Sequence, residues 1–382
     1  MRKIELSYQL SAQRERGTLI RNQLMDLLQA VRAQGSISGA ARCLSLSYRH
    51  VWGLLKEWEQ TVGQDLIVWE RGQSAQLTPF ADKLLWTERL AQARLAPQIE
   101  ALRAELERTL ALAFDEASHV LSLYASHDDA LPLLMDHATG AARLHLDIRF
   151  CGSVDAIRAL NEGRSVLAGF HVREKPPADS LSAQAYRGLL QPGQHKLIGF
   201  ARRTQGLIVA PGNPMKIDGL PRAALWRARF VNRALGTGTR VLLDELLDEA
   251  GVAPEQLNGY ERSELSHAAV AQAIANGSAD VGLGTEASAR RLGLGFVPLA
   301  QENYHLVCLK SALEQPAVRA LREVLATPAW QALLSGTPGC APQRSGEVLS
   351  LRDALPWWKL PPRRMPARKA ATSATGRTPT RP

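Results

Sequence analysis

The sequence predicts a multidomain α/β protein with a helical front part, one long connecting helix and two α/β lobes. Three observations predict this fold class. Two short amphipathic helical stretches follow each other near the N-terminus, a long stripe of helix-spaced apolar residues comes next, and apolar strands alternate with helices from residue 118 onward. At 382 residues and 45% apolar content, the chain can build two or three substantial cores.

The net charge of +9 is concentrated at the C-terminus. Seven Lys or Arg residues and no acidic residue lie within 359–382, which leaves +2 for the rest of the chain. Bulk charge is therefore a weak argument for DNA binding, and that argument has to come from a motif. We expect 359–382 to be a disordered basic tail and 1–18 to be an N-terminal extension.

Cysteine usage and hydropathy exclude several classes of protein. The N-terminus has no apolar signal segment, and no stretch approaches the roughly 18 apolar residues of a membrane span. The four cysteines have neither zinc-site nor disulfide spacing, which favours reduced thiols: Cys43, Cys151, Cys308 and Cys340. We expect a cytoplasmic protein with no membrane partner, metal or cofactor.

The first helical stretch is followed by a helix-turn-helix pattern. Apolar residues at helical spacing run from Leu19 to Ala33, and Gly35 ends the segment. A short helix is predicted from about Ser36, a turn at 45–46, and a second helix capped by Ser47. The inner faces of two helices crossing at a steep angle need small and apolar residues, which are supplied by Ala41, Leu44, Leu46, Val51 and Leu54. Ser45 stands where such motifs often carry glycine.

A β-hairpin is predicted after these helices. Residues 66–78 cluster strand-forming residues around a polar tip at 71–74, and Thr78-Pro79 supplies the cap and first-turn proline of a further helix. This hairpin is a wing, and residues 19–82 form the predicted DNA-binding domain. The second helix would lie in the major groove, with Arg71 at the wing tip and these residues at the groove: Ser47, Tyr48, Arg49, His50, Trp52 and Lys56. The alternative is a plain helical hairpin whose Arg49 is a solvated surface charge.

Residues 83–117 are predicted to form a linker helix that dimerises. Apolar residues recur at three, four or seven positions, with charges on the other faces. Pro97 predicts a kink or break near Ala96. The stripe consists of Phe80, Leu84, Ala91, Leu95, Ile99, Leu102, Leu106 and Leu110. The same stripe could alternatively pack within one chain, but a palindromic operator favours a homodimer or homotetramer.

Residues 118–358 read as a two-lobed α/β effector domain. Strands separated by helices indicate βαβ units and a parallel sheet, with lobe I at about 118–202 and 300–358 and lobe II at about 203–299. Hydroxyl and glycine residues follow several strands and begin helices, at Ser126, Ser153, Thr237-Gly238-Thr239 and Ser266-His267. Each alone is explained as a helix cap, but together they predict an anion site in one cleft.

Catalytic and nucleotide-binding patterns are not met. The Gly-Thr-Gly-Thr turn at 236–239 lacks the third glycine of a dinucleotide fingerprint and the Gly-Lys pair of a P-loop. The His/carboxylate cluster at 127–129 is explained more simply by first-turn helix charges. We therefore expect a protein that is not an enzyme and has no catalytic residues.

Two resemblances to known families become specific at this point. GSISGAARCLSLSYRHVW, LIVWERG and AQLTPFADKLL resemble the winged helix-turn-helix of LysR-type regulators and of the molybdate-responsive regulator ModE. The segments SHDDALPLL, QGLIVAPGNP, RFVNRALGTGTRVLLDELL, SHAAVAQAIANGSADVGLGTEASAR and ENYHLVCLK resemble the periplasmic-binding-protein-like domain related to molybdate and tungstate receptors. The first implies a dimeric transcription factor whose Arg49 reads double-stranded operator DNA.

The second resemblance implies the ligand and its shell. The expected effector is molybdate or tungstate, in a regulator of molybdoenzyme or molybdate-transport genes; formate for a formate dehydrogenase operon is the alternative. A chain that only binds molybdate, without specific DNA readout, is the alternative of another class. The implied shell is Ser126, Ser153, Thr237, Gly238, Thr239 and Tyr304, with His127, Asn232, Arg233 and His267 as further members.

Overall fold

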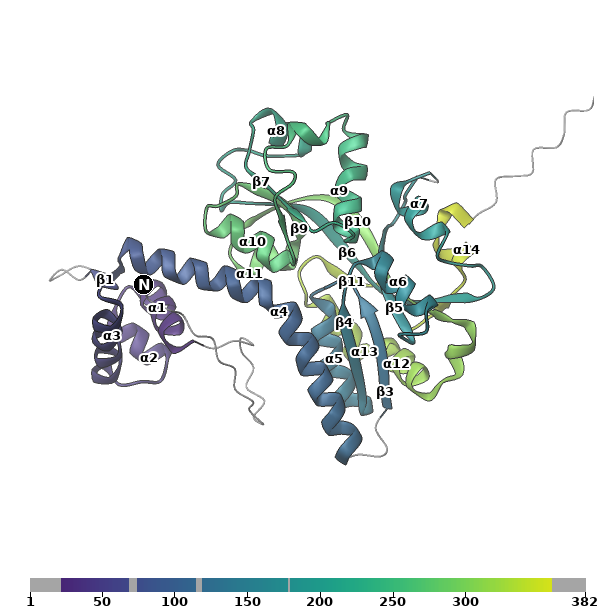
Figure 1. The fold of residues 1–382 in the computed structure, drawn as a ribbon, viewed down its shortest axis with the longest axis horizontal. Helices are drawn as coiled ribbons and strands as arrows, with labels where there is room; N and C mark the ends of the chain where they lie inside the picture. The colour runs from purple at the N-terminus through teal and green to yellow at the C-terminus, as the bar shows by residue number, and fades with distance from the viewer. Residues whose placement is uncertain (1–21, 69–73, 115–118, 178, 359–382) are drawn as a thin grey trace, which may run out of the picture.

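The computed structural model describes residues 22–68, 74–114, 119–177 and 179–358. Its front part is a small helical domain with a two-stranded wing, set apart from the rest of the molecule (Figure 1). Its core is made by one face of each helix, with Leu28, Val31, Ala40, Val51 and Leu55 fully or almost fully buried. The elements are α1 (Gln23–Gln34), α2 (Ile37–Cys43), α3 (Tyr48–Val62), β1 (Ile67–Val68) and β2 (Gln76–Leu77).

Local side-chain chemistry sets the helix boundaries of this domain. Ser36 and Ser47 cap α2 and α3 by accepting from the N–H groups of Gly39 and His50. Gly35 ends α1 in the left-handed conformation, with φ 59°. The predicted helix-turn-helix is therefore present at the predicted positions. The part of the first helix expected before residue 22, the extension 1–18 and the tail 359–382 lie outside the described residues.

One long helix joins the front domain to the rest of the chain. Helix α4 (Pro79–Phe114) begins directly after the wing and contains Pro97 as an internal residue. It changes direction along its length (Figure 1), so the proline kinks the helix rather than ending it. Ala104 of its second half is buried in the core of lobe I. Leu84 of the apolar stripe packs against the core of the front domain, so the stripe packs partly within the chain, while Leu95, Leu102 and Leu110 remain exposed.

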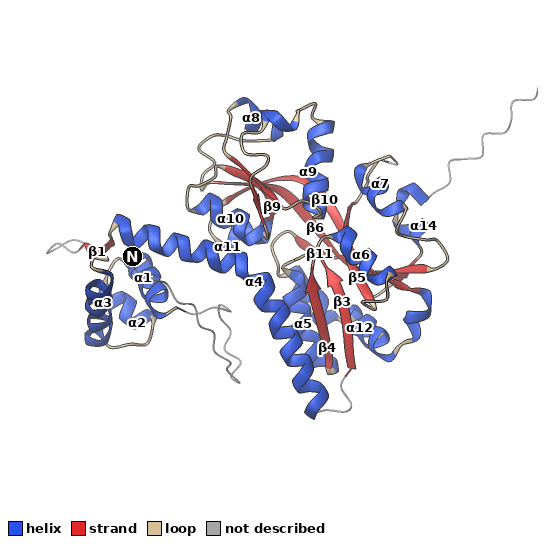
Figure 2. Ribbon diagram, in the orientation of Figure 1, coloured by secondary structure: helices blue, strands red, loops and turns tan. Residues whose placement is uncertain are grey.

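The rest of the described chain is built on one ten-stranded sheet, in the order β4-β3-β5-β10-β6-β9-β7-β8, with β11 and β12 paired to β6. Figure 2 shows helices around the strands of both lobes. The strands are β3 (His119–Ala125), β4 (Leu144–Phe150), β5 (Leu167–Arg173), β6 (His195–Val209), β7 (Phe230–Arg233), β8 (Ser263–Glu264), β9 (Val281–Thr285), β10 (Gly295–Leu309), β11 (Cys340–Pro342) and β12 (Val348–Leu349).

The sheet is mixed, where the sequence predicted a parallel one. Strands β3, β4 and β5 are parallel to one another, as are β7, β8 and β9. The two 15-residue strands β6 and β10 are antiparallel to each other and to β9 and β5, and they run through both lobes. Alternation of strands and helices gives no signal for such crossing strands, so the prediction was wrong for the centre of the sheet.

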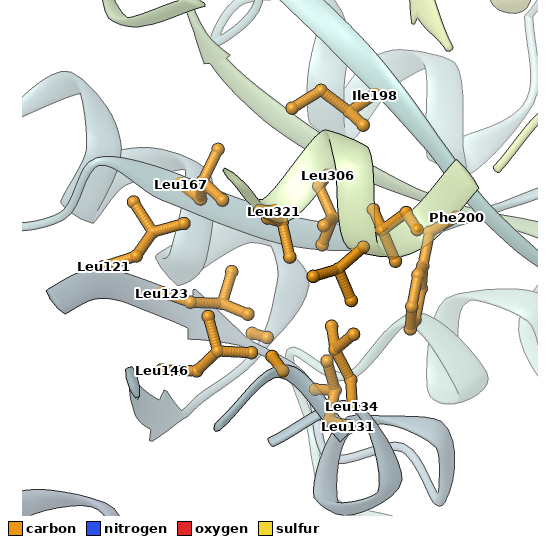
Figure 3. Close-up of a cluster of buried hydrophobic side chains, with 14 of the residues drawn as sticks. Leu121, Leu123, Leu131, Leu134, Leu146, Leu167, Ile198, Phe200, Leu306 and Leu321 are labelled. Atoms are coloured by element: carbon orange, nitrogen blue, oxygen red, sulfur yellow. The ribbon is translucent and has the colours of Figure 1, made fainter. Parts of the chain in front are cut away.

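Helices cover both faces of each lobe. Figure 3 shows the lobe I core, in which Leu123 of β3, Leu306 of β10 and Leu321 of a covering helix meet. The helices are α5 (Ala130–Ala142), α6 (Ser153–Asn161), α7 (Leu181–Arg187), α8 (Leu220–Leu225), α9 (Gly238–Glu249), α10 (His267–Ala275), α11 (Glu286–Arg291), α12 (Pro316–Ala326), α13 (Pro328–Ser335) and α14 (Leu351–Ala354), with short 3-10 turns at Pro254–Gln256, Lys310–Glu314 and Pro356–Trp358. In the part of the chain that the structure describes, no helix has the length and apolarity needed to cross a membrane.

Candidate functional site

The exposed start of α3 presents the side chains predicted to read DNA. Tyr48, Arg49 and His50 form the first turn and are all exposed, whereas Val51 points inward and is fully buried. The Ser47 hydroxyl accepts from the His50 N–H at 3.2 Å and fixes the helix start. An exposed first turn carrying hydrogen-bond donors is the arrangement by which such a helix contacts base edges in the major groove.

The next turn of α3 carries an aromatic and a cation in contact. The rings of Tyr48 and Trp52 are stacked with their centroids 6.5 Å apart, and Lys56 Nζ lies 5.0 Å from the Trp52 centroid. Lys56 also pairs with Glu59 at 2.7 Å. The carboxylate of Glu59 accepts from the Leu66 N–H at 3.0 Å and so ties α3 to the wing. Arg71, predicted at the wing tip, lies outside the described residues.

The turn between α2 and α3 stores strain at Ser45, whose φ of 56° is left-handed. A residue with a Cβ pays about 1–2 kcal/mol for this conformation, which glycine adopts freely. We expect Ser45→Gly to raise the free energy of unfolding of the front domain by about 1 kcal/mol, because it removes that strain. Urea unfolding followed by the fluorescence of the front-domain tryptophans measures it. A loss of stability would show that the Ser45 hydroxyl matters more than its backbone.

Between the lobes, the starts of three helices meet. A Cβ placed on Gly238, the first residue of α9, would lie 3.4 Å from the hydroxyl of Ser153, the first residue of α6. His267 begins α10, and its Nε2 lies 3.5 Å from the Thr239 hydroxyl. The positive ends of helix dipoles from both lobes therefore face one small region, which we call the interlobe cluster.

The lobe I side of the cluster is a chain of hydrogen bonds. Ser153 Oγ donates to Ser126 Oγ at 3.4 Å, and Ser126 Oγ lies 3.0 Å from His171 Nδ1. Beyond the hydrogen bonds, His171 Nε2 lies at an ion-pair distance of 3.4 Å from Asp128 Oδ2, without hydrogen-bond geometry. The ring of Tyr304 stacks on His171 with a centroid distance of 3.8 Å. All five side chains are buried, so their hydrogen-bond directions are set by one another rather than by water.

A buried arginine closes the cluster toward the crossing strands. Arg203 of β6 pairs with Asp128 and, at 2.9 Å, with Glu302 of β10. Burial opposes the charge, but the two carboxylates raise the pKa of Arg203 above its usual value. Burial would favour the neutral acid at Asp128, yet Arg203 and His171 hold its pKa far below the usual range. Arg203 is thus neutralised within the protein.

The lobe II side is a set of polar atoms around Thr239. Gln205 Nε2 donates to Thr239 Oγ1 at 3.1 Å and to Glu302 at 3.0 Å. Burial, together with the cations Arg233 and Arg203, lowers the pKa of His267 well below its usual value, so its ring is neutral. His267 Nδ1 and Gln205 Oε1 have no hydrogen-bond partner among the described residues.

Arg233 is the second cation of the cluster. Among the described residues, no carboxylate accepts a hydrogen bond from it. It is 2% exposed, and its Nη1 donates to the backbone oxygen of Glu264 at 3.0 Å. Its Nε has no partner in the described part of the chain. Burial and then Arg203 lower the pKa of Arg233 to about 9. A buried guanidinium in this condition gains free energy from any anion that reaches it.

Most of the residues predicted for the anion shell lie in or at this cluster, and three have their side chains elsewhere. His127 Nε2 lies 3.0 Å from Glu100 of α4. The Asn232 side chain bonds the Tyr260 backbone, and the Thr237 hydroxyl caps α9 and donates to Ala234 O at 2.8 Å. The members brought together are Ser126, Ser153, Arg233, Gly238, Thr239, His267 and Tyr304.

The two lobes touch at several points around the cluster. Gly152, the cap of α6, packs against the backbone oxygen of Gly236 with no room for a Cβ. Ser182 of α7 donates to Glu245 of α9 from both its N–H and its hydroxyl, at 2.8 and 2.6 Å. Asp129 pairs with Arg291 of α11 at 3.0 Å. The structure is therefore that of a closed pair of lobes.

Helix α4 contacts both lobes at its kinked middle. Arg94 makes a bidentate pair with Glu264 of lobe II, at 2.7 and 2.6 Å, and Ser266 donates to Ala93 O. Six residues later Glu100 pairs with His127 of lobe I. A change in the angle between the lobes must therefore break or move a contact with the helix that carries the DNA-binding domain.

Two family models match the chain. Residues 135–326, half of its length, match the PBP superfamily domain. The chain belongs to the PBP superfamily. Residues 22–82 match the bacterial regulatory helix-turn-helix protein of the lysR family. The front domain is therefore a lysR-family helix-turn-helix, and the chain is a DNA-binding transcriptional regulator with a ligand-binding effector domain of the PBP superfamily.

Curated relatives of the chain have names that state no ligand. The chain is 28% identical over 227 residues to the uncharacterized protein YvgK of Bacillus subtilis (strain 168), spanning 59% of this chain and 73% of that protein. It is 31% identical over 111 residues to an uncharacterized protein in the 5' region of a ferredoxin 2Fe-2S gene of Clostridium pasteurianum, spanning 29% of this chain and 98% of that protein.

Two solved structures are also similar to the chain over most of its length. Full-length LysG from Corynebacterium glutamicum with bound effector Arg is 18% identical, with 79% of this chain and 95% of that chain covered and a TM-score of 0.36. ArgP from Mycobacterium tuberculosis is 19% identical, with 85% and 100% covered and a TM-score of 0.38. These scores are low, so the assignment of the two domains depends on the family models.

Five cluster residues were missed by sequence reasoning: Asp128, His171, Arg203, Gln205 and Glu302. Two pairs of polar residues, Arg203 with Gln205 and Glu302 with Tyr304, sit two positions apart on strands that are otherwise largely apolar. That spacing places each pair on one face of its strand, and this signal could have found them. No group of His, Cys, Asp and Glu suited to a metal ion occurs among the described residues, and the four cysteines are free.

Proposed function

We propose that this regulator senses a small tetrahedral oxyanion, molybdate or tungstate, between its lobes and controls molybdoenzyme or molybdate-transport genes from the cytoplasm. The ModE-like sequence of the front domain motivates the choice of anion. Operator DNA is read by α3, with Arg49 as the main contact to a base. Formate, for a formate dehydrogenase operon, is the alternative effector.

The observation that carries the proposal is the interlobe cluster. Starts of α6, α9 and α10 from both lobes meet there, with the hydroxyls of Ser153 and Thr239 at the meeting point. Arg233 adds a buried positive charge that the protein does not neutralise by a hydrogen-bonded carboxylate among its described residues. Hydroxyl and N–H donors with one such cation are the groups that replace the water around an oxyanion.

Closure of the lobes supports the route from the anion to DNA. An anion shifts an equilibrium only when it binds one arrangement better than the other. The donor groups of the two lobes come together only when the lobes are closed. The anion therefore binds more tightly to the closed arrangement than to an open one. Because α4 is held by Glu264 of lobe II and His127 of lobe I, closure fixes where the front domain sits.

A homodimer or homotetramer is part of the proposal. Among the stripe residues of α4, Phe80, Leu95, Leu102 and Leu110 are 38%, 41%, 44% and 57% exposed. These side chains lie on the helix that leaves the front domain, and pairing two copies along it would place two recognition helices on one palindromic operator.

Removing the Thr239 hydroxyl tests the anion site. We expect Thr239→Ala to weaken molybdate binding by about 10- to 100-fold, since a hydrogen bond to a charged group is worth about 1.5–3 kcal/mol. The measurement is calorimetric titration of the full chain with molybdate, tungstate, sulfate and formate in turn. Thr327→Ala is the matched control, because it removes a hydroxyl that caps α13 outside the cluster.

The titrations separate the candidate effectors. Tight molybdate or tungstate binding that Thr239→Ala weakens and Thr327→Ala does not would support the metal oxyanion. Binding of formate alone would select the carboxylate alternative. Equal molybdate affinity in Thr239→Ala and wild type would remove the interlobe cluster as the binding site.

Replacing Arg49 tests DNA readout. We expect Arg49→Ala to weaken operator binding by about 1–3 kcal/mol and to relax the base preference. The reason is that a side chain at a base edge contributes to affinity and to base discrimination. A fragment selected from random DNA by the full chain serves as operator in gel-shift titrations. Arg158→Ala on lobe I, an exposed arginine paired with Asp155, is the control. Failure to select any sequence would favour a molybdate-binding protein without specific DNA readout.

A further inference from the structure

The proton positions in the Ser153-Ser126-His171-Asp128 chain follow from its two ends. Asp128 is ionised against Arg203 and accepts from the Ala130 N–H at 2.9 Å, so it offers only lone pairs. The ionised carboxylate of Asp128 lies 3.4 Å from His171 Nε2, without hydrogen-bond geometry, and its negative charge favours the tautomer with the proton on Nε2. A neutral imidazole has one N–H, which leaves Nδ1 of His171 as an acceptor.

The hydroxyl protons are then directed away from a ligand. Ser126 donates its proton to His171 Nδ1 at 3.0 Å, since Nδ1 has none to give. Ser153 donates to Ser126 Oγ at 3.4 Å. An oxyanion placed against these two serines would face oxygen lone pairs, which repel it. With a neutral His171, the lobe I side of the cluster is arranged for a hydrogen-bond donor.

One added proton reverses this arrangement. We propose that His171 is a specificity-determining residue of the anion site and takes up one proton from solvent when a fully deprotonated oxyanion binds. Nδ1–H then donates to Ser126 Oγ, whose second lone pair still accepts from Ser153. The Ser126 proton is released from His171 and donates to the anion. This inference rests on the proposed function, and it makes anion affinity depend on pH.

The surroundings of His171 single it out as the group that changes protonation. Burial and then Arg203 lower its pKa, whereas Asp128 and Glu302 act to raise it. An anion beside Ser126 adds a further negative charge in the same direction as those carboxylates. The charged and titratable groups that face His171 are Asp128 before α5, Arg203 on β6, Glu302, Tyr304 and His305 on β10, and Tyr186 on α7.

The neighbours themselves hold one protonation state near neutral pH. Burial raises the pKa of Tyr304 and of Tyr186 above the usual tyrosine value, so both stay neutral. Burial lowers the pKa of His305 to about 4, so it stays neutral as well. Asp128 and Arg203 stay charged. Among the groups around Ser126 and Ser153, His171, which the Ser126 hydroxyl contacts directly, is the one left to titrate.

The test counts protons during molybdate binding to the full chain. Calorimetric titrations at one pH, in two buffers of different ionisation enthalpy, give the number of protons taken up. We expect about one, and a molybdate affinity that rises by up to about tenfold for each unit that the pH falls. His171→Gln should abolish both, while His305→Gln, which replaces a buried histidine that does not contact the serines, should keep them.

The titrations test the proton uptake by His171 separately from the oxyanion sensing. Molybdate binding without proton uptake in wild type, or with uptake unchanged in His171→Gln, overturns the inference and leaves the proposed function standing. No binding of any of the four anions overturns the proposed function and the inference with it. If His171→Gln does not fold, the ring ¹⁵N shifts of wild type without anion decide: a proton on Nε2 agrees with the inference, and a proton on Nδ1 contradicts it.

Discussion

Arg203→Leu is expected to lower the free energy of unfolding of the effector domain by about 3–5 kcal/mol, because removing one partner of a buried ion pair leaves charge buried and unpaired. Arg203 is 2% exposed and pairs with both Asp128 and Glu302. Loss of the guanidinium leaves two buried carboxylates, those of Asp128 and Glu302, without the cation that they share. Denaturant unfolding of variant and wild type at neutral pH measures the difference.

Two comparisons make that result specific. Arg290→Ala removes an exposed arginine that pairs with Glu286 on α11, and its effect should stay within about 0.5 kcal/mol. The pKa of Asp128 is lowered in the folded chain, so its stabilisation is present above the usual aspartate pKa and is lost as the pH falls below it. The penalty of Arg203→Leu should therefore shrink in acid. A penalty equal to that of Arg290→Ala would contradict the buried pairing.

Gly152→Ala is expected to prevent the lobes from reaching the closed arrangement. A Cβ on Gly152 would stand closer to the Gly236 backbone oxygen than real Cβ atoms come, and a backbone oxygen cannot turn aside. The closed state would be depleted, and the apparent anion affinity falls in proportion to the fraction of closed molecules. We expect a loss of molybdate affinity of about tenfold or more and a larger radius of gyration in small-angle X-ray scattering.

A glycine elsewhere supplies the control. Gly140 lies in α5, where an added Cβ meets nothing within 4 Å. Gly140→Ala should be neutral or stabilise the chain by about 0.5–1 kcal/mol, because glycine is unfavourable inside a helix. If Gly152→Ala binds molybdate as wild type does and keeps the same radius of gyration, the contact between Gly152 and Gly236 has no role in closure.

The helical parts of the fold could be predicted because their signals are local. Ser36, Ser47 and Gly35 mark helix ends by chemistry that acts within three or four residues, and the structure places them at those ends. The antiparallel strands β6 and β10 were missed, because pairing between residues such as Gln205 and Ala300 leaves no trace in either segment alone. The alternation of strands and helices predicts two lobes. The strands that connect the lobes pair residues far apart in the sequence, and a local pattern cannot show that pairing.

The candidate site, like the fold, could be predicted only where the signal is local in the sequence. Hydroxyls at helix starts, such as Ser153 and Thr239, could be predicted because a strand followed by Ser or Thr and a helix is visible in sequence. His171 and Glu302 could not, because their role depends on which strands lie next to each other in the sheet. The sequence also could not show that His127 points to Glu100, since the path of α4 is set by packing.

The most direct test of the account is a crystal structure of the full chain with tungstate, read from anomalous scattering of the metal. We expect a peak in the interlobe cluster, with the tungstate oxygens within hydrogen-bond distance of the hydroxyls of Ser126 and Thr239. A peak only on the outer surface of the lobes, or none at saturating tungstate, would contradict oxyanion sensing between the lobes.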